Sequence, residues 1–274
     1  MRDSATQAPL TDFDALERSN WAGQAEEYRT SYALVCAGAV PYLADPVSIR
    51  PGSLVLDVGT GTGTAAAAAI ALGAKVTAVD ADPGMVATAA ALVTEAEFRV
   101  AALPTLPFGD RQFDLALANF VLNHVGRPRA ALAELRRVTV RGGRVAITLW
   151  PQPASPAIAL LTQAIRDCGA ARPARRLEPS EDFPRTEGGL RGLLGDAGLR
   201  EPACRLIDWR LTVEPHQWWG IASGASWVRA FTKSQEPALL SKIRDRFNEL
   251  SSDYRGEDGR LCLPVTALLA HGKA

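Results

Sequence analysis

Three glycines in close succession, Gly59, Gly61 and Gly63, are the most informative residues of this chain. They follow an apolar run at 53–58 and precede an alanine-rich stretch, which is the order of a strand, a turn and a helix. Glycines in such a turn let the backbone approach a ligand closely, and the helix start offers unpaired N–H groups and a positive dipole end. The segment, with Thr60 inside it, therefore predicts a cofactor-binding turn.

The spacing of the glycines argues against a dinucleotide as the ligand. A dinucleotide fingerprint reads G-x-G-x-x-G, whereas here the pattern is G-x-G-x-G, with Thr64 where the third glycine would stand. Asp57 adds a carboxylate two residues before the first glycine. A nicotinamide oxidoreductase is therefore disfavoured.

A second carboxylate, Asp80, ends the next predicted strand, seventeen residues after Gly63. In that position it can accept hydrogen bonds from both hydroxyls of a ribose. The alternative is that Asp80 caps the following helix. Asp82, directly before Pro83, is the better cap, so we predict that Asp80 binds the ligand.

The stretch 55–63 resembles the first motif of the class I methyltransferases that use S-adenosylmethionine, whose signature is close to V-L-D-x-G-x-G-x-G. Within that class the chain is most similar to the UbiE-like, type 11 group that acts on small molecules. The resemblance implies that the turn packs under the methionine part of the cofactor, with Asp57 near its amino end and Asp80 on its ribose. Ala81 and Met85 would then lie near the adenine.

One departure from the family pattern concerns the adenine. The segment 103–108, followed by Phe113 and Asp114, resembles the family stretch A-x-x-L-P-F-x-x-x-x-F-D. Many relatives carry an acidic residue where this chain has Ala102, and that residue accepts a hydrogen bond from the adenine amino group. We therefore expect backbone groups around Ala102 and Leu103, or water, to bind the adenine, and we interpret Asp114 as structural.

The substrate side is predicted at the end of the fourth strand, 113–119. Ligands bind at the carboxyl edge of open α/β sheets, and Asn119, Asn123 and His124 resemble the family segment that borders the methyl group and the substrate. We predict that Asn119 binds the cofactor and that Asn123 and His124 contact the substrate. His124 is a candidate general base, because a histidine ordinarily gains and loses a proton near neutral pH. A hydrogen-bonded structural histidine is the alternative.

Aromatic residues supply further candidates. Trp21 and Tyr28 resemble an N-terminal W-x-x-x-A-x-x-Y segment of small-molecule members, which implies that an aromatic residue folds over the cofactor. We predict Tyr28 in that position and as the second candidate base, and we predict Trp21 at the substrate. Trp150, His216 and Trp219 are predicted to line the substrate cavity, with Trp218 and Trp227 close by in sequence. Burial in the core is the alternative for all of these aromatic side chains.

Composition limits the partners. Of the 274 residues, 47% are hydrophobic, which is enough for one large α/β domain with a sizeable core. Thirty basic and thirty acidic residues give a net charge of zero, so there is no electrostatic case for a nucleic acid or a membrane surface. An N-P-P-Y-type tetrapeptide after the fourth strand, typical of nucleic-acid methyltransferases, is also missing. We expect a small-molecule substrate and a monomer or homodimer.

The cysteines and the N-terminus indicate the compartment. Cys36, Cys168, Cys204 and Cys262 form no C-x-x-C pair, which predicts a reduced protein without a metal. The N-terminus has no basic start followed by an apolar run, and no apolar stretch is long enough for a membrane span. We expect a cytoplasmic protein, and the high use of Ala, Arg and Gly indicates a bacterial source.

Predicted strands alternate with predicted helices through the first half of the chain. This order favours a doubly wound, Rossmann-like, mostly parallel sheet, which the family would complete to seven strands with an antiparallel edge hairpin from 204–213 and 261–270. Two helices are expected within 14–42. The predicted organisation is an N-terminal helical lid (1–45), the S-adenosylmethionine-binding core (46–150), a cap that selects the substrate (151–200), and C-terminal edge strands with a helical segment between them (201–274).

The predicted function is methyl transfer from S-adenosylmethionine to a small-molecule acceptor in bacterial secondary metabolism, by in-line displacement at the sulfonium methyl. The acceptor atom is open at this point. One alternative is an enzyme of the same fold that keeps the cofactor and performs non-methylating chemistry such as a cyclisation, to which Ala102 gives some weight. The other is a non-catalytic binding protein.

Overall fold

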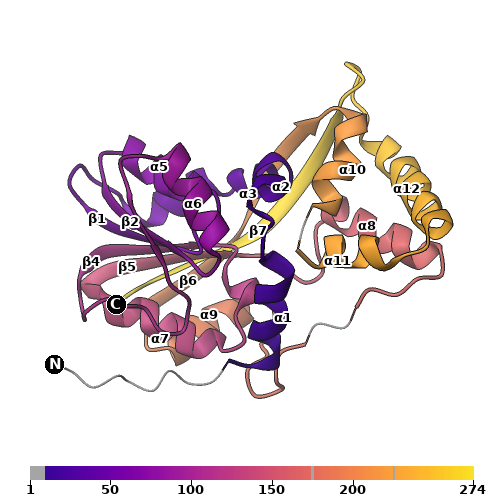
Figure 1. Ribbon diagram of the computed structural model, residues 1–274. Coiled ribbons are helices and arrows are strands. Elements are labelled where there is room, and N and C mark those ends of the chain that lie inside the picture. The colour runs from indigo at the N-terminus through magenta and orange to yellow at the C-terminus, as the bar shows by residue number, and fades with distance from the viewer. Residues whose placement is uncertain (1–9, 174–175, 225) are drawn as a thin grey trace.

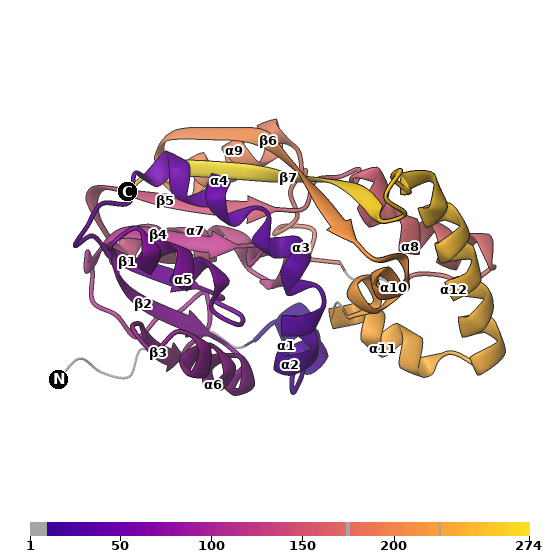
Figure 2. The same cartoon turned by 90° about the horizontal axis from the view of Figure 1, so that it is seen from above.

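One sheet organises the molecule, with the strand order β3-β2-β1-β4-β5-β7-β6 (Figures 1 and 2). The computed structural model describes residues 10–173, 176–224 and 226–274. Within them the sheet consists of β1 (Leu54–Val58), β2 (Lys75–Asp80), β3 (Glu97–Val100), β4 (Phe113–Asn119), β5 (Thr139–Leu149), β6 (Arg200–Val213) and β7 (Leu261–Lys273).

The first five strands are parallel and the last two are antiparallel to their neighbours. β1 pairs with β2 on one side and with β4 on the other, so the strand order reverses at β1. Ligands of open α/β sheets bind outside the carboxyl ends of the strands at such a reversal. The predicted doubly wound, seven-stranded sheet with an antiparallel edge hairpin is confirmed.

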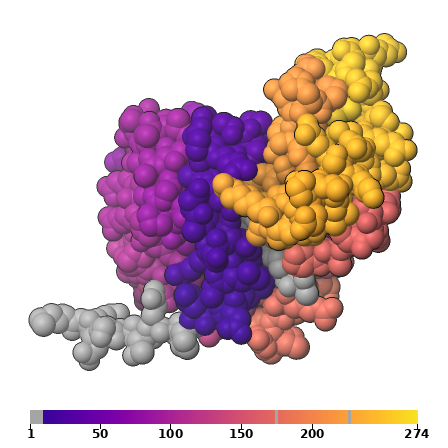
Figure 3. Space-filling view, turned by 45° about the vertical axis from the view of Figure 1, so that its right-hand side comes forward, coloured from indigo at the N-terminus to yellow at the C-terminus, as the bar shows by residue number. Residues whose placement is uncertain are grey.

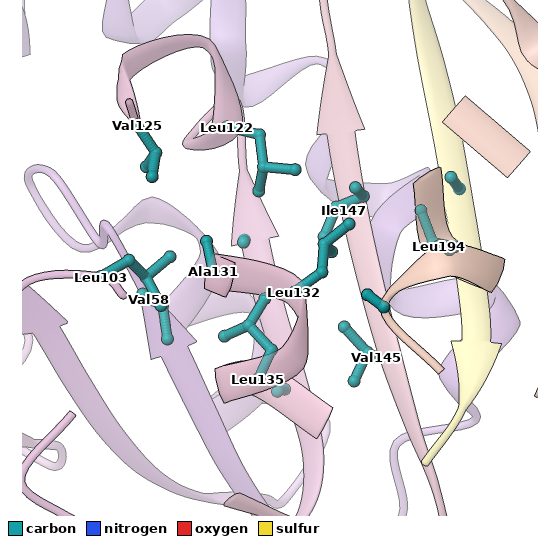
Figure 4. Close-up of a cluster of buried hydrophobic side chains, with 14 of the residues drawn as sticks. Val58, Leu103, Leu122, Val125, Ala131, Leu132, Leu135, Val145, Ile147 and Leu194 are labelled. Carbon is teal, nitrogen blue, oxygen red and sulfur yellow. The ribbon is translucent and has the colours of Figure 1, made fainter. Parts of the chain in front are cut away.

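Helices cover both faces of the sheet, because successive residues of each central strand point to opposite sides. Val55 packs in a cluster with α4 (Val40–Ala44) and α5 (Thr64–Ala71), whereas its neighbour Leu56 packs in a cluster with α7 (Pro128–Val138) and α9 (Glu187–Asp196). Figure 4 shows the second cluster, in which side chains of α7 meet those of β1 and β5. α6 (Pro83–Leu92) packs against β2 and β3.

A third cluster lies beyond the end of the sheet, where β6 and β7 extend to meet a group of helices (Figure 1). These helices are α8 (Pro156–Asp167), α10 (Pro215–Ser223), α11 (Ser226–Ser234) and α12 (Pro237–Ser251). From here on we use the name cap for these four helices, in place of the predicted range 151–200. Trp218 and Phe247 are among its most deeply buried side chains. The cap therefore contains helices from both predicted regions, 151–200 and 201–274. α9 does not belong to it and packs against β6, β7 and α7.

The N-terminal region differs from the prediction of two helices within 14–42. It forms four short helices, α1 (Asp12–Trp21), α2 (Ala25–Thr30), α3 (Ala33–Ala37) and α4. The prediction was wrong because the aromatic and apolar spacing was counted as continuous. The backbone turns at Gly23 with a φ of +67° and again at Ser31, where φ and ψ are −128° and −103°.

The N-terminal segment lies between the core and the cap in Figure 3, and α4 at its end packs on α5 and on the sheet. This position of the segment places Trp21 and Tyr28 near the ends of the central strands. No helix in the described ranges is both long and apolar enough to cross a membrane.

Candidate active site

The glycine turn after β1 has a backbone that only glycine adopts easily. The φ angles of Gly59, Gly61 and Gly63 are +65°, +56° and +91°, all in the left-handed region. A side chain at Gly59 would overlap Val121, and one at Gly61 would meet the ring of Tyr28 at 3.1 Å. The turn thus exposes backbone without side chains at Gly59, Gly61 and Gly63, and we call these residues the cradle. Gly63 is also the N-cap residue of α5.

Asp57 lies beneath this cradle and is only 1% exposed. Its Oδ2 accepts a hydrogen bond from Thr60 Oγ1 at 2.7 Å, whereas Oδ1 has no partner with hydrogen-bond geometry among the described residues. Burial raises the pKa of Asp57 to about 7. The backbone N–H of Ala66 lies near the carboxylate and opposes the rise of its pKa. A buried carboxylate oxygen without a donor is an unusual and costly feature. It fits a ligand that brings a positively charged amino group.

Asp80 joins the cradle to the end of β2. Its Oδ2 accepts the N–H of Gly61 at 2.9 Å and its Oδ1 accepts the N–H of Asp82 at 3.0 Å. Burial raises the pKa of Asp80. Asp82 caps α6 through the N–H of Met85, as predicted, so Asp80 remains available to a ligand.

A cavity of about 1060 Å³ opens at the carboxyl ends of β1, β2 and β4, between the N-terminal helices and the cap. This volume is at the upper end of the range for small-molecule sites, enough for a cofactor and a second molecule. Most of the predicted site residues line it together: Trp21, Tyr28, Gly59, Gly61, Asp80, Ala81, Met85, Ala102, Leu103, Asn119, Asn123, His124 and Trp150. Asp57 and Thr60 instead line a small adjoining cavity beneath the turn.

The predicted adenine end of the cavity is formed by Ala102 and Leu103 together with Ala81 and Met85. The Ala102 side chain has no polar atom, and its carbonyl accepts the N–H of Thr105 at 3.2 Å. This geometry fits an adenine held by apolar contact and backbone groups.

Asn119 is held by the protein at the end of β4. Its side-chain amide donates to the carbonyl of Cys36 at 3.2 Å and accepts from Thr148 Oγ1 at 2.6 Å. Thr148 Oγ1 also accepts the N–H of Phe120, whose φ of +58° is rare for a residue with a side chain. Strained backbone of this kind clusters at functional sites. The Phe120 ring stacks on the ring of Trp150, with 4.0 Å between the centroids.

His124, at the end of η2 (Leu122–His124), contacts two residues of α1. Its Nδ1 lies 2.6 Å from Oε2 of Glu17 and 3.3 Å from Nε1 of Trp21. The rings of Trp21 and Tyr28 meet edge to face, with 5.3 Å between the centroids. Sequence reasoning missed both Glu17 and Thr148. The only signal for Glu17 is its position four residues before Trp21, on the same face of a helix.

The candidate bases differ in character. Burial raises the pKa of Tyr28 well above its ordinary value, which keeps the side chain a neutral phenol without the phenolate that could accept a proton. The phenol ring lies over Gly61, as the predicted position over the cofactor requires. Burial therefore argues against Tyr28 as the base, and His124 stays the other candidate.

Two predicted substrate residues do not reach the cavity. Trp219 packs edge to face against Phe247, and neither it nor His216 is among the described residues that line the cavity. Trp218, which is 1% exposed, lines it instead. Successive residues of a helix point about 100° apart, so only one of two adjacent tryptophans in α10 faces inward.

Trp227 also lines the cavity, and Arg172 lies over its ring at 4.5 Å from the centroid. Nε1 of Trp218 has no hydrogen-bond partner within the described part of the chain. The cap side of the cavity thus presents aromatic and apolar side chains with a free indole donor, and Arg172, Arg176 and Arg185 add positive charge to the lining.

Comparison with known proteins supports the resemblance to the S-adenosylmethionine-dependent methyltransferases. Residues 56–147 match the model of the family described as a methyltransferase domain. The demethylmenaquinone methyltransferase of Renibacterium salmoninarum is 35% identical over 111 residues, which cover 40% of this chain and 47% of that protein. An uncharacterized protein of Mycobacterium tuberculosis is 34% identical over 151 residues, 54% of this chain and 53% of that protein. The matches thus span about half the length of these curated relatives.

Solved structures share the fold at low sequence identity. The YcgJ protein from Bacillus subtilis aligns with a TM-score of 0.56 and 20% identity over 86% of this chain and 97% of that chain. A putative methyltransferase from an antibiotic biosynthesis pathway of Anabaena variabilis gives a TM-score of 0.58 and 17% identity over 86% and 96% of the two chains.

The sheet order and the sequence match together assign the core of the chain to a family. Residues 56–147 form a class I methyltransferase domain of the S-adenosylmethionine-dependent kind. The resemblance inferred from the glycine motif is confirmed. The roles of the individual site residues stay predictions.

Proposed function

We propose that this protein transfers a methyl group from S-adenosylmethionine to a small, flat and largely apolar acceptor. The observation that carries the proposal is the unpartnered Oδ1 of Asp57, buried beneath a glycine cradle that opens on a cavity for two molecules. When bound there, the cofactor supplies an electrophilic methyl group on a sulfonium that is already a good leaving group.

The residues of the chain divide between the two halves of the cavity. Asp57 would attract the amino group of the methionine part and Asp80 would accept the ribose hydroxyls, while Tyr28 would cover the cofactor at Gly61. Asn119, Phe120 and the residues of the cap would hold the acceptor in line with the methyl group. Holding two reactants in line can contribute roughly 7–11 kcal/mol to the reduction of a barrier.

The acceptor class follows from the cap side of the cavity. Phe120 and Trp150 are stacked at its wall, and Trp218 and Trp227 complete an aromatic lining. Aromatic faces favour flat, apolar ligands. The demethylmenaquinone methyltransferases among the relatives act, by their names, on such a molecule, which supports an acceptor of the quinol or phenol type. A role in biosynthesis or secondary metabolism is part of this proposal.

The test combines binding with product analysis. Titration calorimetry with S-adenosylmethionine and S-adenosylhomocysteine measures cofactor binding. Incubation with methyl-labelled cofactor and a panel of hydroxylated naphthalenes and reduced demethylmenaquinone then identifies a labelled product. We expect tight binding, S-adenosylhomocysteine release and one added methyl group on the acceptor. A product that forms without demethylation of the cofactor would replace this proposal with non-methylating chemistry, and absence of cofactor binding would reject it.

A further inference from the structure

His124 contacts a carboxylate and an indole N–H through the same ring nitrogen. Oε2 of Glu17 lies 2.6 Å from Nδ1 and Nε1 of Trp21 lies 3.3 Å from it. A neutral imidazole carries one proton, so Nδ1 either donates to Glu17 or accepts from Trp21. The two contacts are therefore alternatives. If Nδ1 donates to Glu17, Nε2 has no proton, and if Nδ1 accepts from Trp21, Nε2 carries the proton.

Distance and burial favour the carboxylate. The Glu17 side chain is 3% exposed, and a carboxylate removed from water needs donors to offset the loss of hydration. Hydrogen bonds to an ionised acceptor are also shorter and stronger than those between neutral groups. Nδ1 of His124 therefore carries the proton and donates to Glu17, which leaves Nε2 with an unshared electron pair.

We propose that Glu17 is a positioning residue that holds His124 as the general base of this enzyme, an inference that rests on the proposed methyl transfer. The acceptor carries a hydroxyl group. Its proton moves to Nε2 of His124 while the oxygen forms a bond to the methyl carbon, and the carbon–sulfur bond breaks with its electron pair remaining on sulfur. The imidazolium so formed is stabilised by the Glu17 carboxylate and later releases its proton to water.

Contacts from α1, in the N-terminal lid, hold His124 in position as the base. One turn before Glu17, Oδ1 of Asp14 accepts the N–H of Gly126 at 2.7 Å, so α1 is fastened to the loop that carries His124 at two successive points. Asp14, Glu17 and Trp21 share one face of α1, because they are three and four residues apart. Sequence position separates Glu17 from His124 by 107 residues, so the pair exists only while α1 is docked.

The position of the proton on His124 can be measured without an acceptor. The ¹⁵N shifts of histidine side chains distinguish a protonated ring nitrogen from an unprotonated one, and His216→Gln and His271→Gln assign the three histidines of the chain. The protein is measured with S-adenosylhomocysteine bound, at a pH where His124 is neutral. We expect the proton on Nδ1 in the wild type and in Trp21→Phe, and on Nε2 in Glu17→Met, whose thioether is only a weak acceptor.

The wild-type spectrum alone decides the geometry if Glu17→Met does not fold. A proton on Nε2 in the wild type, or the same tautomer in wild type and Glu17→Met, would overturn the inference. With a methylated naphthol as product, we further expect Glu17→Met to lower kcat at least tenfold with little change in KM. Failure of cofactor binding would instead reject the proposed function, so the two failures are distinguishable.

Discussion

The backbone N–H of Gly61 donates a hydrogen bond to Oδ2 of Asp80 at 2.9 Å. This bond connects the turn after β1 with the end of the neighbouring strand β2, next to a second bond from the N–H of Thr60 to the carbonyl of Val79 at 3.0 Å. The carboxylate proposed to bind the ribose therefore also holds the cradle in place. Cradle and ribose site form one hydrogen-bonded unit.

Asp80→Asn is expected to weaken S-adenosylmethionine binding by about 10- to 100-fold. The substitution keeps the shape of the side chain but removes its charge, and hydrogen bonds to a charged group contribute about 1.5–3 kcal/mol, where each 1.4 kcal/mol is a factor of ten. Titration calorimetry measures the affinity. Asp114→Asn is the matched control, since Asp114 accepts the N–H of Leu54 at the opposite end of the sheet. Equal affinity in the two variants would contradict the ribose assignment.

Gly61→Ala is expected to reduce cofactor affinity by more than tenfold. Its Cβ would lie 3.1 Å from the Tyr28 ring, in the space where we propose that the cofactor meets the turn. Gly142→Ala is the control, because Gly142 has a similar left-handed φ of +79° but open space around it. Both substitutions carry the backbone cost of about 1 kcal/mol. If calorimetry gives the same affinity for both, the close approach at Gly61 has no role in binding.

The sheet and the cofactor side were predictable because their signals are local. The alternation of apolar runs with turns predicted β1 to β5, and a motif contiguous in sequence predicted the cradle and Asp80. Glu17 and Thr148 were missed because their importance arises from contacts with residues far away in the sequence. No pattern within α1 tells whether a glutamate points to solvent or to a histidine more than a hundred residues away.

The substrate side was predicted only in outline. Two adjacent tryptophans in a helix do not show which side of the helix faces the cavity, so the sequence could not separate Trp218 from Trp219. The packing of α10 against Phe247 decides between them. The N-terminal helices show the same limit. Their aromatic residues were recognised, but the turns at Gly23 and Ser31 depend on how the segment folds over the cavity.

Thr148→Val is expected to destabilise the protein by about 1–3 kcal/mol. Valine has nearly the same shape, but it leaves the N–H of Phe120 without its acceptor and Asn119 without its donor, and buried polar groups left unpaired cost this much. Thr139→Val, in the same strand, removes only a donor to the carbonyl of Leu135 and is expected to cost less. Urea denaturation measures both. A smaller effect at Thr148 would show that it does not support the Asn119–Phe120 corner.

Asp57 gives the stability of the protein a distinct pH dependence. Its pKa is about 7 in the folded protein, against an ordinary value of 3.8 in the unfolded chain, because burial disfavours the charge. Between these two values the folded state binds the extra proton, so the contribution of Asp57 to stability is fully present below about pH 4 and is lost as the pH rises to about 7. Asp57→Asn carries no such proton. The unfolding free energy of the wild type minus that of Asp57→Asn should therefore fall from pH 4 to pH 7 and then level off.

Urea denaturation at several pH values, without cofactor, measures this difference directly. Using the difference removes the part of the Asp80 titration that both proteins share, and only the repulsion between Asp57 and Asp80 remains in it. A difference that rises with pH would mean that the charged form of Asp57 is stabilised in the folded protein by a donor to Oδ1. A bound amino group is expected to provide that donor, so saturating S-adenosylhomocysteine should reduce the fall seen in its absence, because the ligand binds the ionised carboxylate more tightly.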